Sequence, residues 1–185
     1  MIDETLVEAE ELMERAVEAT SEDFATVRTG RANPALYSKV LVDYYGSATP
    51  LQQLASFNIP DARTILITPY DISAMREIER ALSDSEIGAN PSNDGKQIRI
   101  TMPDLTEERR REYVKLVKSK GEDHKVSVRN ARRKAKDVIE KAVKSGDVGE
   151  DDGERGTKEL ENLTKTYVDR IDDMIKRKEA ELLEV

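Results

Sequence analysis

Five basic side chains recur at helical spacing in the second half of the chain: Lys118, Lys125, Arg129, Arg132 and Lys136. Their spacing places them on one face of an α-helix, with Arg133 at its edge. A row of cations along a rigid helix suits the phosphates of a nucleic acid, and the arginine fork matches phosphate geometry. No aromatic residue interleaves with the row, which favours shape recognition of folded RNA over base stacking. The alternative is a solvated face with intrahelical pairs to Glu122 and Glu140.

The charge of this segment differs from that of the rest of the chain. The 185 residues carry 30 Lys and Arg against 38 Asp and Glu, a formal net charge of -8. Residues 106–145 hold 14 basic and 7 acidic side chains, whereas the net charge is -7 for residues 1–29 and -6 for residues 146–185. Because charge is screened over about 10 Å, a local basic surface can bind a polyanion despite the negative total. The basic segment could equally pair with the two acidic ones in a bundle.

Three segments have the apolar spacing of long amphipathic helices: residues 1–29, 106–145 and a third from about Glu150. The apolar seam of the first comprises Ile2, Leu6, Ala9, Met13, Ala16, Thr20, Phe24 and Val27. The seam of the second comprises Tyr113, Val117, Lys120 or Gly121, His124, Val128, Ala131, Ala135, Val138 and Ala142. The third carries Leu160, Leu163, Tyr167, Ile171, Met174 or Ile175, and Leu182. Short polar links between them predict a long antiparallel three-helix bundle.

Glycines mark expected ends and weak points of these helices. Gly30 and Gly146 should end the first two, and Thr106 should cap the second. Gly121 should cost the second helix about 1 kcal/mol relative to Ala. Gly153 and Gly156 should weaken the first turns of the third helix, so we expect that end to fray.

Residues 30–104 differ from the helical segments in composition, since they contain prolines and short β-rich runs. Strands are expected near residues 39–45, 55–59, 64–68 and 97–102. A helix is expected over residues 71–85, with Ile72, Met75, Ile78 and Leu82 on its apolar face. The sequence therefore predicts an α+β protein in which a small β/α/β domain, residues 30–104, is inserted into a bundle of residues 1–29 and 105–185.

Two chain crossings join the predicted domains, at residues 29–31 and 103–105. We expect a hinge there, made of Thr29, Gly30, Arg31, Pro103, Asp104 and Leu105. Gly30 is the residue from which we expect unusual backbone freedom.

Several kinds of site lack the residues they require. The chain has no Cys and one His, His124, which falls on the apolar seam and is expected to be a packed bundle histidine. A calcium-loop alignment of residues 150–154 puts Val148 at the first ligand position, which breaks the site. No nucleotide-binding glycine motif is present. We therefore expect no metal, no cofactor and no enzymatic activity.

The sequence also indicates in which cellular compartment to expect the protein. No run of about 18 apolar residues exists, and the acidic N-terminal segment lacks the features of a signal peptide. We expect a cytoplasmic monomer with no membrane contact.

Two smaller features have open interpretations. Tyr44 and Tyr45 adjoin a strand end and Gly46, where they could pack in the turn or contact a partner. Residues 109–111 are three adjacent arginines, which spread around a helix and so form a weaker candidate for RNA contact than the row.

Several separated blocks, in order along the whole chain, resemble the ribosome recycling factor family: RTGRANPAL at 28–36, YYGSATPL at 44–51, NPSNDG at 90–95, LTEERR at 105–110 and VRNARRK at 128–134. The resemblance implies an L-shaped protein of roughly tRNA dimensions, with the bundle as its long arm and the insert as its short arm. It implies binding across the A and P sites of the 50S subunit after termination. It also implies subunit splitting with elongation factor G and GTP, which releases mRNA and deacylated tRNA.

The resemblance also suggests residue roles. Arg132, Arg129 and Arg133 would contact 23S rRNA, and Arg28 and Arg31 would lie at the hinge end of the bundle. The candidate RNA-contacting set is therefore Arg132, Arg129, Arg133, Lys136, Lys125, Lys118, Arg28, Arg31, Arg109 and Arg110. The short arm would meet elongation factor G. The rival interpretation is a coiled-coil adaptor that binds a protein instead of RNA.

Overall fold

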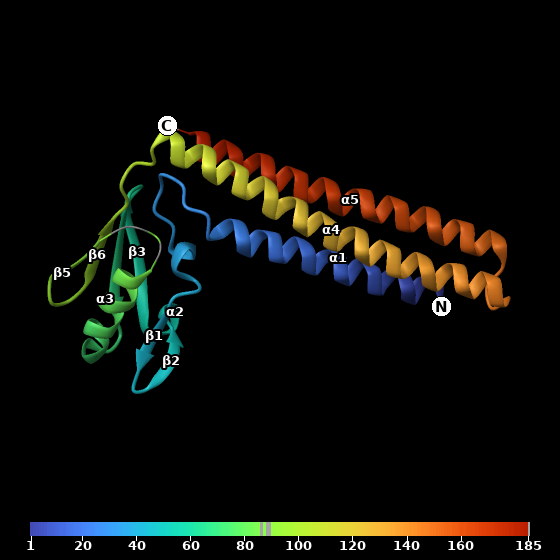
Figure 1. Ribbon diagram of the computed structural model, residues 1–185. Coiled ribbons are helices and arrows are strands. Elements are labelled where there is room, and N and C mark those ends of the chain that lie inside the picture. Colours follow the sequence, from blue (N-terminus) through green and yellow to red (C-terminus); the bar gives the residue numbers. More distant parts are fainter. Residues whose placement is uncertain (86, 88–89, 185) are drawn as a thin grey trace. The chain divides into compact units, whose positions relative to one another are not determined.

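The chain forms two compact units in the computed structural model, which describes residues 1–85, 87 and 90–184 (Figure 1). Unit 1 comprises Met1–Phe24 and Val114–Ala180. Unit 2 comprises Ala25–Tyr113 and the C-terminal residues from Glu181. The domain limits expected at residues 29–30 and 104–105 stay a prediction.

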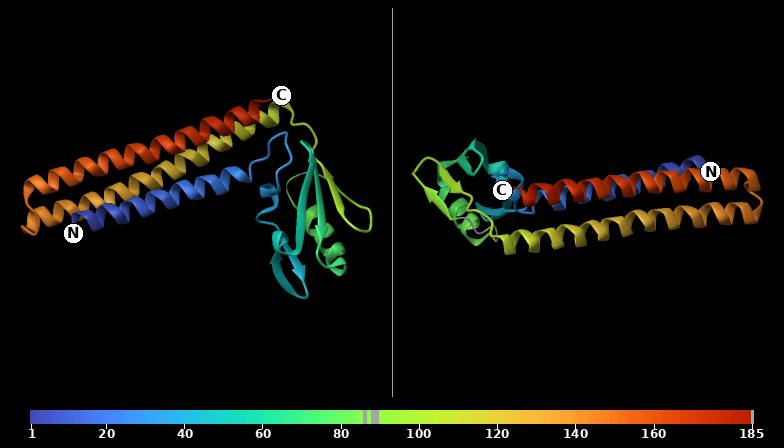
Figure 2. Two further views of the ribbon diagram at one scale, coloured as in Figure 1. Left: turned by 180° about the vertical axis from the view of Figure 1, so that it is seen from behind. Right: turned by 90° about the horizontal axis from the view of Figure 1, so that it is seen from above.

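Three long helices build the bundle: α1 (Ile2–Ala25), α4 (Glu107–Ser145) and α5 (Glu150–Leu183). They run side by side, with α4 antiparallel to the other two (Figures 1 and 2). Thr106 caps α4, since its Oγ1 accepts a hydrogen bond from the Arg109 N–H at 3.1 Å. Gly146 follows α4 with a φ of 83°, the left-handed conformation that ends a helix. The antiparallel three-helix bundle is therefore confirmed.

The apolar seams form the bundle core with two differences from the expectation. Along α4, Ile139 is 2% exposed whereas Val138 is 41% exposed, so the predicted assignment of Val138 to the seam is wrong. Helix α1 ends at Ala25 and not at Gly30, although Val27 beyond it is still buried. A side chain can thus follow the apolar period after its backbone has left the helix, so the period alone does not locate the helix end.

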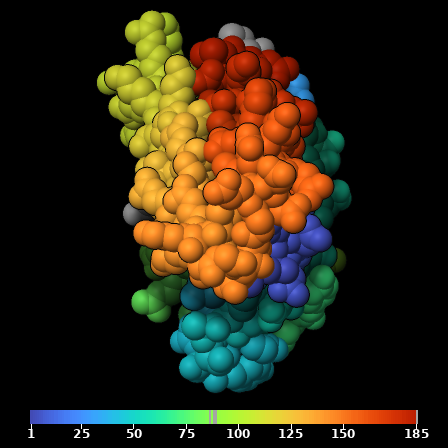
Figure 3. Space-filling view, turned by 90° about the vertical axis from the view of Figure 1, so that its right-hand side faces the viewer, coloured from blue at the N-terminus to red at the C-terminus, as the bar shows by residue number. Residues whose placement is uncertain are grey.

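The helical glycines lie at close helix contacts. A Cβ on Gly121 would lie 2.3 Å from Ile175 Cδ1, and one on Gly153 would lie 2.3 Å from Val143 Cγ2. Gly156 is likewise close to Ile2, at the end of unit 1 where the start of α1 lies beside α5 (Figure 3). The start of α5, where we expected fraying, is regular helix from Glu150 in this structure, and both glycines are buried.

Unit 2 contains a two-stranded and a four-stranded antiparallel sheet. The first pairs β1 (Leu41–Tyr44) with β2 (Ser47–Pro50), and the second has the order β3 (Ala55–Asp61), β4 (Thr64–Pro69), β6 (Ile98–Thr101) and β5 (Pro91–Asn93). The helical elements are η1 (Pro34–Tyr37), α2 (Leu51–Leu54), η2 (Ile72–Ala74) and α3 (Met75–Asp84). The small sheet-and-helix insert is confirmed, and β2 and β5 are strands that the sequence did not predict.

The core of unit 2 is rich in branched aliphatic residues. Ile65, Ile67, Ile98 and Ile100 of the sheet are fully buried together with Ile78 of α3. Met75 and Leu82 of α3 are also buried, as predicted. Ile72 is 68% exposed, so its predicted place on the apolar face is wrong. It lies in the 3₁₀ turn of η2, whose tighter period rotates it off the face that α3 presents to the sheet.

Among the described residues, no helix is both long and apolar enough to cross a bilayer.

Candidate nucleic-acid interface

The basic row on α4 divides into a part that faces α5 and a part that faces outward. Lys118, Lys125 and Arg132, spaced by seven residues, pair with Glu179, Asp172 and Glu161 of α5. We call these three cations and their acidic partners the ladder. The partners occur in the opposite order along α5, as antiparallel helices require. Heptad-spaced opposite charges beside an apolar seam bind two helices together.

Lys125 is the most deeply buried charge of the ladder. Only 8% of the residue is exposed. Its Nζ lies 2.7 Å from Glu122 Oε1 and also contacts Asp172 Oδ1. Burial opposes the charged form, but the hydrogen bonds to Asp172 and Glu122 outweigh it and raise the pKa of Lys125. The ammonium is thus fixed between the two helices.

The expectation that Lys125 belongs to an outward row is therefore wrong. The reason lies one turn earlier, where Gly121 has no side chain and Ile175 of α5 packs against it. This close approach brings Asp172 over Lys125. Lys125 packs its aliphatic stem on the seam and gives its charge to the ladder.

Arg132 occupies the edge of the ladder. Its Nε and Nη2 donate to one oxygen of Glu161, at 2.9 and 2.6 Å, while 35% of its side chain stays exposed. Lys118 lies 3.4 Å from Glu179 Oε1, and Lys136 lies 3.8 Å from Glu140 Oε1 on its own helix. These contacts confirm much of the alternative interpretation, in which the basic side chains pair with acidic side chains of the bundle.

Pairing also reaches α1. Lys134 donates to Glu8 at 3.0 Å, and His124 Nε2 lies 2.6 Å from Asp23 Oδ2 in a half-buried contact. The prediction of a packed bundle histidine is confirmed. The basic helix is thus held on one side by α1 and on the other by α5.

Arg129 and Arg133 remain outside this network. Both are exposed, and neither has an ion-pair or side-chain hydrogen-bond partner within residues 1–85, 87 and 90–184. Their four-residue spacing puts them on one face of a 39-residue helix, next to the exposed part of Arg132. We call Arg129 and Arg133 the outer pair. Two unpaired guanidinium groups on a rigid helix can each bind a phosphate without breaking an existing ion pair.

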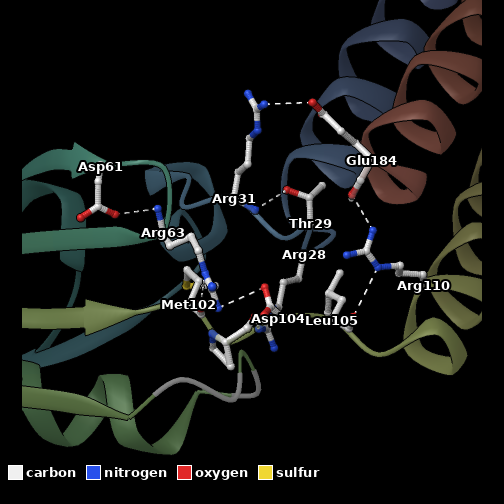
Figure 4. Close-up of polar contacts among 11 residues, drawn as sticks. Arg28, Thr29, Arg31, Asp61, Arg63, Met102, Asp104, Leu105, Arg110 and Glu184 are labelled. Atoms are coloured by element: carbon white, nitrogen blue, oxygen red, sulfur yellow. Dashed lines mark hydrogen bonds and ion pairs between the residues drawn. The ribbon is translucent and has the colours of Figure 1, made fainter.

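The arginines near the predicted hinge have structural partners (Figure 4). Half-buried Arg28 donates from Nη2 to the Pro103 carbonyl. Arg110 donates from Nε to the Leu105 carbonyl at 3.3 Å and from Nη1 to the Leu182 carbonyl at 3.2 Å. Neither guanidinium is free for RNA in this arrangement.

Arg31 and Arg109 are more exposed than these two. Arg31 pairs with the Glu184 carboxylate at 3.0 Å, and Arg109 lies 3.5 Å from Glu112. Exposed pairs of this kind exchange readily with other anions.

The predicted hinge residues have ordinary backbone geometry. The Arg31 N–H donates to Thr29 Oγ1 at 3.2 Å, and Asp104 Oδ1 lies 3.2 Å from Arg63. Leu105 is buried. Gly30 is not among the positive-φ glycines, and a Cβ there would meet nothing within 4 Å. Gly30 therefore adopts backbone angles in this conformation that other residues can also adopt, and the backbone freedom expected there stays a prediction.

The acidic end of unit 1 lines an open pocket of about 650 Å³ that includes Asp3, Asp147, Asp152 and Glu159. Residues 150–154 form the first turns of α5 and not a calcium-type loop. No group of three or more His, Cys, Asp or Glu among the described residues is arranged to hold a metal ion.

The acidic half of the ladder was missed at the level of sequence. Glu161, Asp172 and Glu179 are spaced by 11 and 7 residues, which puts them on one face of a helix. This second row, read together with 118, 125 and 132, would have separated the ladder from the outer pair.

The chain is similar in sequence to the proteins of one known family. The sequence model of the ribosome recycling factor family matches residues 20–183. The ribosome-recycling factors of Pseudarthrobacter chlorophenolicus and Micrococcus luteus are 71% and 72% identical to it over 185 residues, covering 100% of each chain. That of Streptomyces coelicolor is 60% identical with the same coverage.

Two solved structures share the fold. A solution structure of the ribosome recycling factor superposes with a TM-score of 0.79 at 38% identity and covers 100% of this chain and 98% of that one. The Thermus thermophilus factor, seen with Escherichia coli elongation factor G on the E. coli post-termination complex, gives a TM-score of 0.70 at 38% identity with 100% coverage of both chains. Family membership also bears out the expectation that the chain is not an enzyme. The chain belongs to the ribosome recycling factor family.

Proposed function

We propose that this protein binds the post-termination ribosome and, with elongation factor G and GTP, splits it into subunits, releasing mRNA and deacylated tRNA. The full-length match to a factor that is bound, together with elongation factor G, to a post-termination complex carries the proposal. Its place of action is then the cytoplasm, where ribosomes are recycled.

We assign the contact with large-subunit RNA to the outer pair, supported by Arg132 and Lys136. The outer pair is exposed and unpaired among the described residues, so a phosphate contact there disrupts no ion pair. Arg132 can exchange Glu161 for a phosphate because the pair is partly exposed. Lys125 cannot exchange its carboxylate partners for a phosphate in this way, because its charge is buried in the ladder.

Cosedimentation with 50S subunits, followed by splitting of post-termination ribosomes with elongation factor G and GTP, tests the function. We expect salt-sensitive 50S binding and factor-dependent splitting. The adaptor alternative predicts no binding to ribosomal subunits and weak salt dependence, and either result would contradict the proposal.

The hinge at residues 29–31 and 103–105 is a second part of the proposal. Rotation there would transmit force from the insert to the RNA-bound bundle. The support is connectivity, since only two chain crossings join the predicted domains. An engineered disulfide that locks the insert to the bundle should leave 50S binding intact and block splitting. Full splitting by the locked protein would contradict the hinge.

A further inference from the structure

The turn between β3 and β4 holds both of the chain crossings that join the predicted domains. The Ala32 N–H donates to the Ala62 carbonyl at 2.7 Å, and the Met102 N–H donates to the Arg63 carbonyl at 2.7 Å. Residue 32 directly follows the first crossing, and residue 102 directly precedes the second. Both crossings are therefore attached by backbone hydrogen bonds to one turn of the sheet.

Arg63 adds its side chain to the second of these attachments (Figure 4). Its Nε donates to the Met102 carbonyl at 3.0 Å, and its Nη2 lies 3.2 Å from Asp104 Oδ1. The planar guanidinium thus bridges two points of the chain that are close in sequence. Met102 is bound to Arg63 through both its N–H and its carbonyl. We call Arg63, Met102 and Asp104 the clamp.

The segment from Met102 to Asp104 has little freedom to bend or to change its length. The Met102 side chain is fully buried in the core of unit 2. The ring of Pro103 fixes its own φ, and it restricts the preceding Met102 to extended conformations. Asp104 pairs with Arg63. Three successive residues are therefore restrained, the first by burial, the second by its ring and the third by an ion pair.

Asp61 orients Arg63 within the turn. Its Oδ1 accepts a hydrogen bond from the Arg63 N–H at 2.9 Å, which is the pattern of an Asx turn. The register of β3 against β4 shifts between Asn58 and Asp61, and such irregularities re-aim side chains at the rim of a sheet. The direction in which Arg63 leaves the sheet is thus set locally, and it points to the second crossing (Figure 4).

The clamp should contribute little to folding. The side chain of Arg63 is 45% exposed and that of Asp104 is 80% exposed, and water competes effectively with ion pairs of this kind. The buried isoleucines of the sheet pack together whether or not the pair forms. The consequence of the ion pair is therefore expected in the motion of the segment and not in the folding of the insert.

The segment held by the clamp leads into the helix that carries the outer pair. Helix α4 starts at Glu107, soon after Asp104, and Thr106 caps it. A slack connection would stretch or bend before it moved α4. A stiff connection instead transmits a displacement of the sheet to the start of the helix.

We propose that Arg63 is a positioning residue for subunit splitting, which keeps residues 102–104 rigid so that movement of the insert acts on α4 and its RNA-bound outer pair. This inference rests on the proposed function and narrows its hinge. Pro103 and Asp104 then move with the insert, and rotation in the second crossing is left to the bonds that follow Asp104. In the first crossing, rotation is left to the residues before Ala32.

Two variants of Arg63 separate its charge from its geometry. Arg63→Ala removes both side-chain contacts of the clamp and keeps the backbone hydrogen bond to Met102. Arg63→Lys keeps the charge but lacks the planar fork that holds Met102 and Asp104 together. Arg99→Ala is the matched control, since Arg99 is an exposed residue of β6 that, among the described residues, has no hydrogen bond or ion pair with the clamp. All three variants should melt close to the wild-type temperature.

The first measurement is the distance between the insert and the bundle in the free protein. Because the chain has no native cysteine, Ser92→Cys on β5 and Thr166→Cys on α5 create two labelling sites, both of them exposed. Electron–electron double resonance between two spin labels should give a broader distance distribution for Arg63→Ala than for the wild type. Arg99→Ala should match the wild type. Equal widths for the wild type and Arg63→Ala would overturn the inference.

The second measurement is the rate of splitting of post-termination ribosomes against the concentration of elongation factor G, with the recycling factor saturating. Arg63→Ala should lower the maximal rate by about tenfold, the scale of losing one charge-assisted hydrogen bond while the segment is under load. The half-maximal concentration of elongation factor G and the affinity for 50S subunits should not change. A general folding defect would alter both. Arg63→Lys should remain close to Arg63→Ala.

The outcomes that overturn the inference are distinguishable. An unchanged maximal rate for Arg63→Ala would show that the clamp does not act in splitting. Full activity of Arg63→Lys would show that the charge matters and the two-point contact does not. A change in the half-maximal concentration alone would assign Arg63 to binding of elongation factor G instead. If the wild-type protein itself failed to split ribosomes, the proposed function would fall, whereas the distance distributions would still decide whether Arg63 restrains the segment.

Discussion

The ladder and the outer pair lie on the same helix and carry the same charge, yet their surroundings differ completely. Lys125 of the ladder is 8% exposed and touches two carboxylates. Arg129, four residues on, is exposed and has no ion-pair partner in the described part of the chain. A rotation of about 40° around a helix separates the two positions. The difference teaches that a basic row is a binding surface only where the neighbouring helix does not cover it.

The largest expected effect is on RNA binding by the outer pair. Arg129→Ala with Arg133→Ala should weaken 50S binding by about 1–3 kcal/mol for each charge-assisted hydrogen bond to RNA that the variant removes. Stability should change by less than about 0.5 kcal/mol, because both side chains are exposed and unpaired among the described residues. Equilibrium cosedimentation and urea unfolding measure the two quantities. Wild-type affinity would assign RNA contact elsewhere.

The ladder should show the opposite pattern. Lys125→Met keeps the stem but leaves Asp172 and Glu122 without their ammonium, so stability should fall by about 1–3 kcal/mol. The folded variant should bind 50S subunits as tightly as the wild type. Denaturant unfolding gives the first result. Strongly weakened binding by a folded Lys125→Met would return Lys125 to the RNA surface.

The loss of stability caused by Lys125→Met should not depend on pH near neutrality. The folded-state pKa of Lys125 is raised from 10.5, so its stabilisation is complete at lower pH and is lost only as pH rises through the folded-state pKa. The stability difference between wild type and Lys125→Met should therefore be the same at pH 6 and pH 8.

Gly121→Ala tests the close helix contact that covers the ladder. Alanine favours the helix by about 1 kcal/mol. Its Cβ would nevertheless lie 2.3 Å from Ile175 Cδ1 and 2.6 Å from Cγ1, and overpacking typically costs about 1–3 kcal/mol. We expect net destabilisation of about 1 kcal/mol. Gly30→Ala is the control, since it meets no atom within 4 Å and should be neutral or slightly stabilising. A stabilised Gly121→Ala would refute the packing argument.

Glu161→Gln should have the smallest effect. It tests whether Arg132 acts with the structural ladder or with the RNA-binding outer pair. Removing this partly exposed ion pair should lower stability by at most about 1 kcal/mol. Because Arg132 no longer has a competing carboxylate, 50S binding should tighten slightly. Weaker binding by the Glu161→Gln variant than by the wild type would instead mean that Glu161 orients Arg132 for RNA.

Much of the fold follows from the sequence because long seams determine helices. The bundle, the Thr106 cap and the buried face of α3 from Met75 to Leu82 were all predicted. The short strands β2 and β5 were not, since they are polar, begin or end at a proline and lack alternation. Their register is set by the neighbouring strands β1 and β6.

The site was predicted only in part. Helical spacing located the row, but the covering of Lys125 depends on how near α5 comes, which Gly121 and Ile175 decide together. The period of α4 alone does not show which of its cations α5 covers. The glycines of α5 illustrate the same limit, because Gly153 and Gly156 look like weak points in the sequence and are contact points in the bundle.

The salt dependence of 50S binding tests the central claim most directly. For each charge that leaves the RNA contact, the slope of log K against log salt should decrease by about 0.7 to 0.9. Arg129→Ala with Arg133→Ala should therefore reduce the magnitude of the slope by about 1.4 to 1.8, whereas Lys125→Met should leave it unchanged. Equal slopes for the wild type and the arginine variant, or a reduced slope for Lys125→Met, would contradict the division of α4 into a structural ladder and an RNA-binding outer pair.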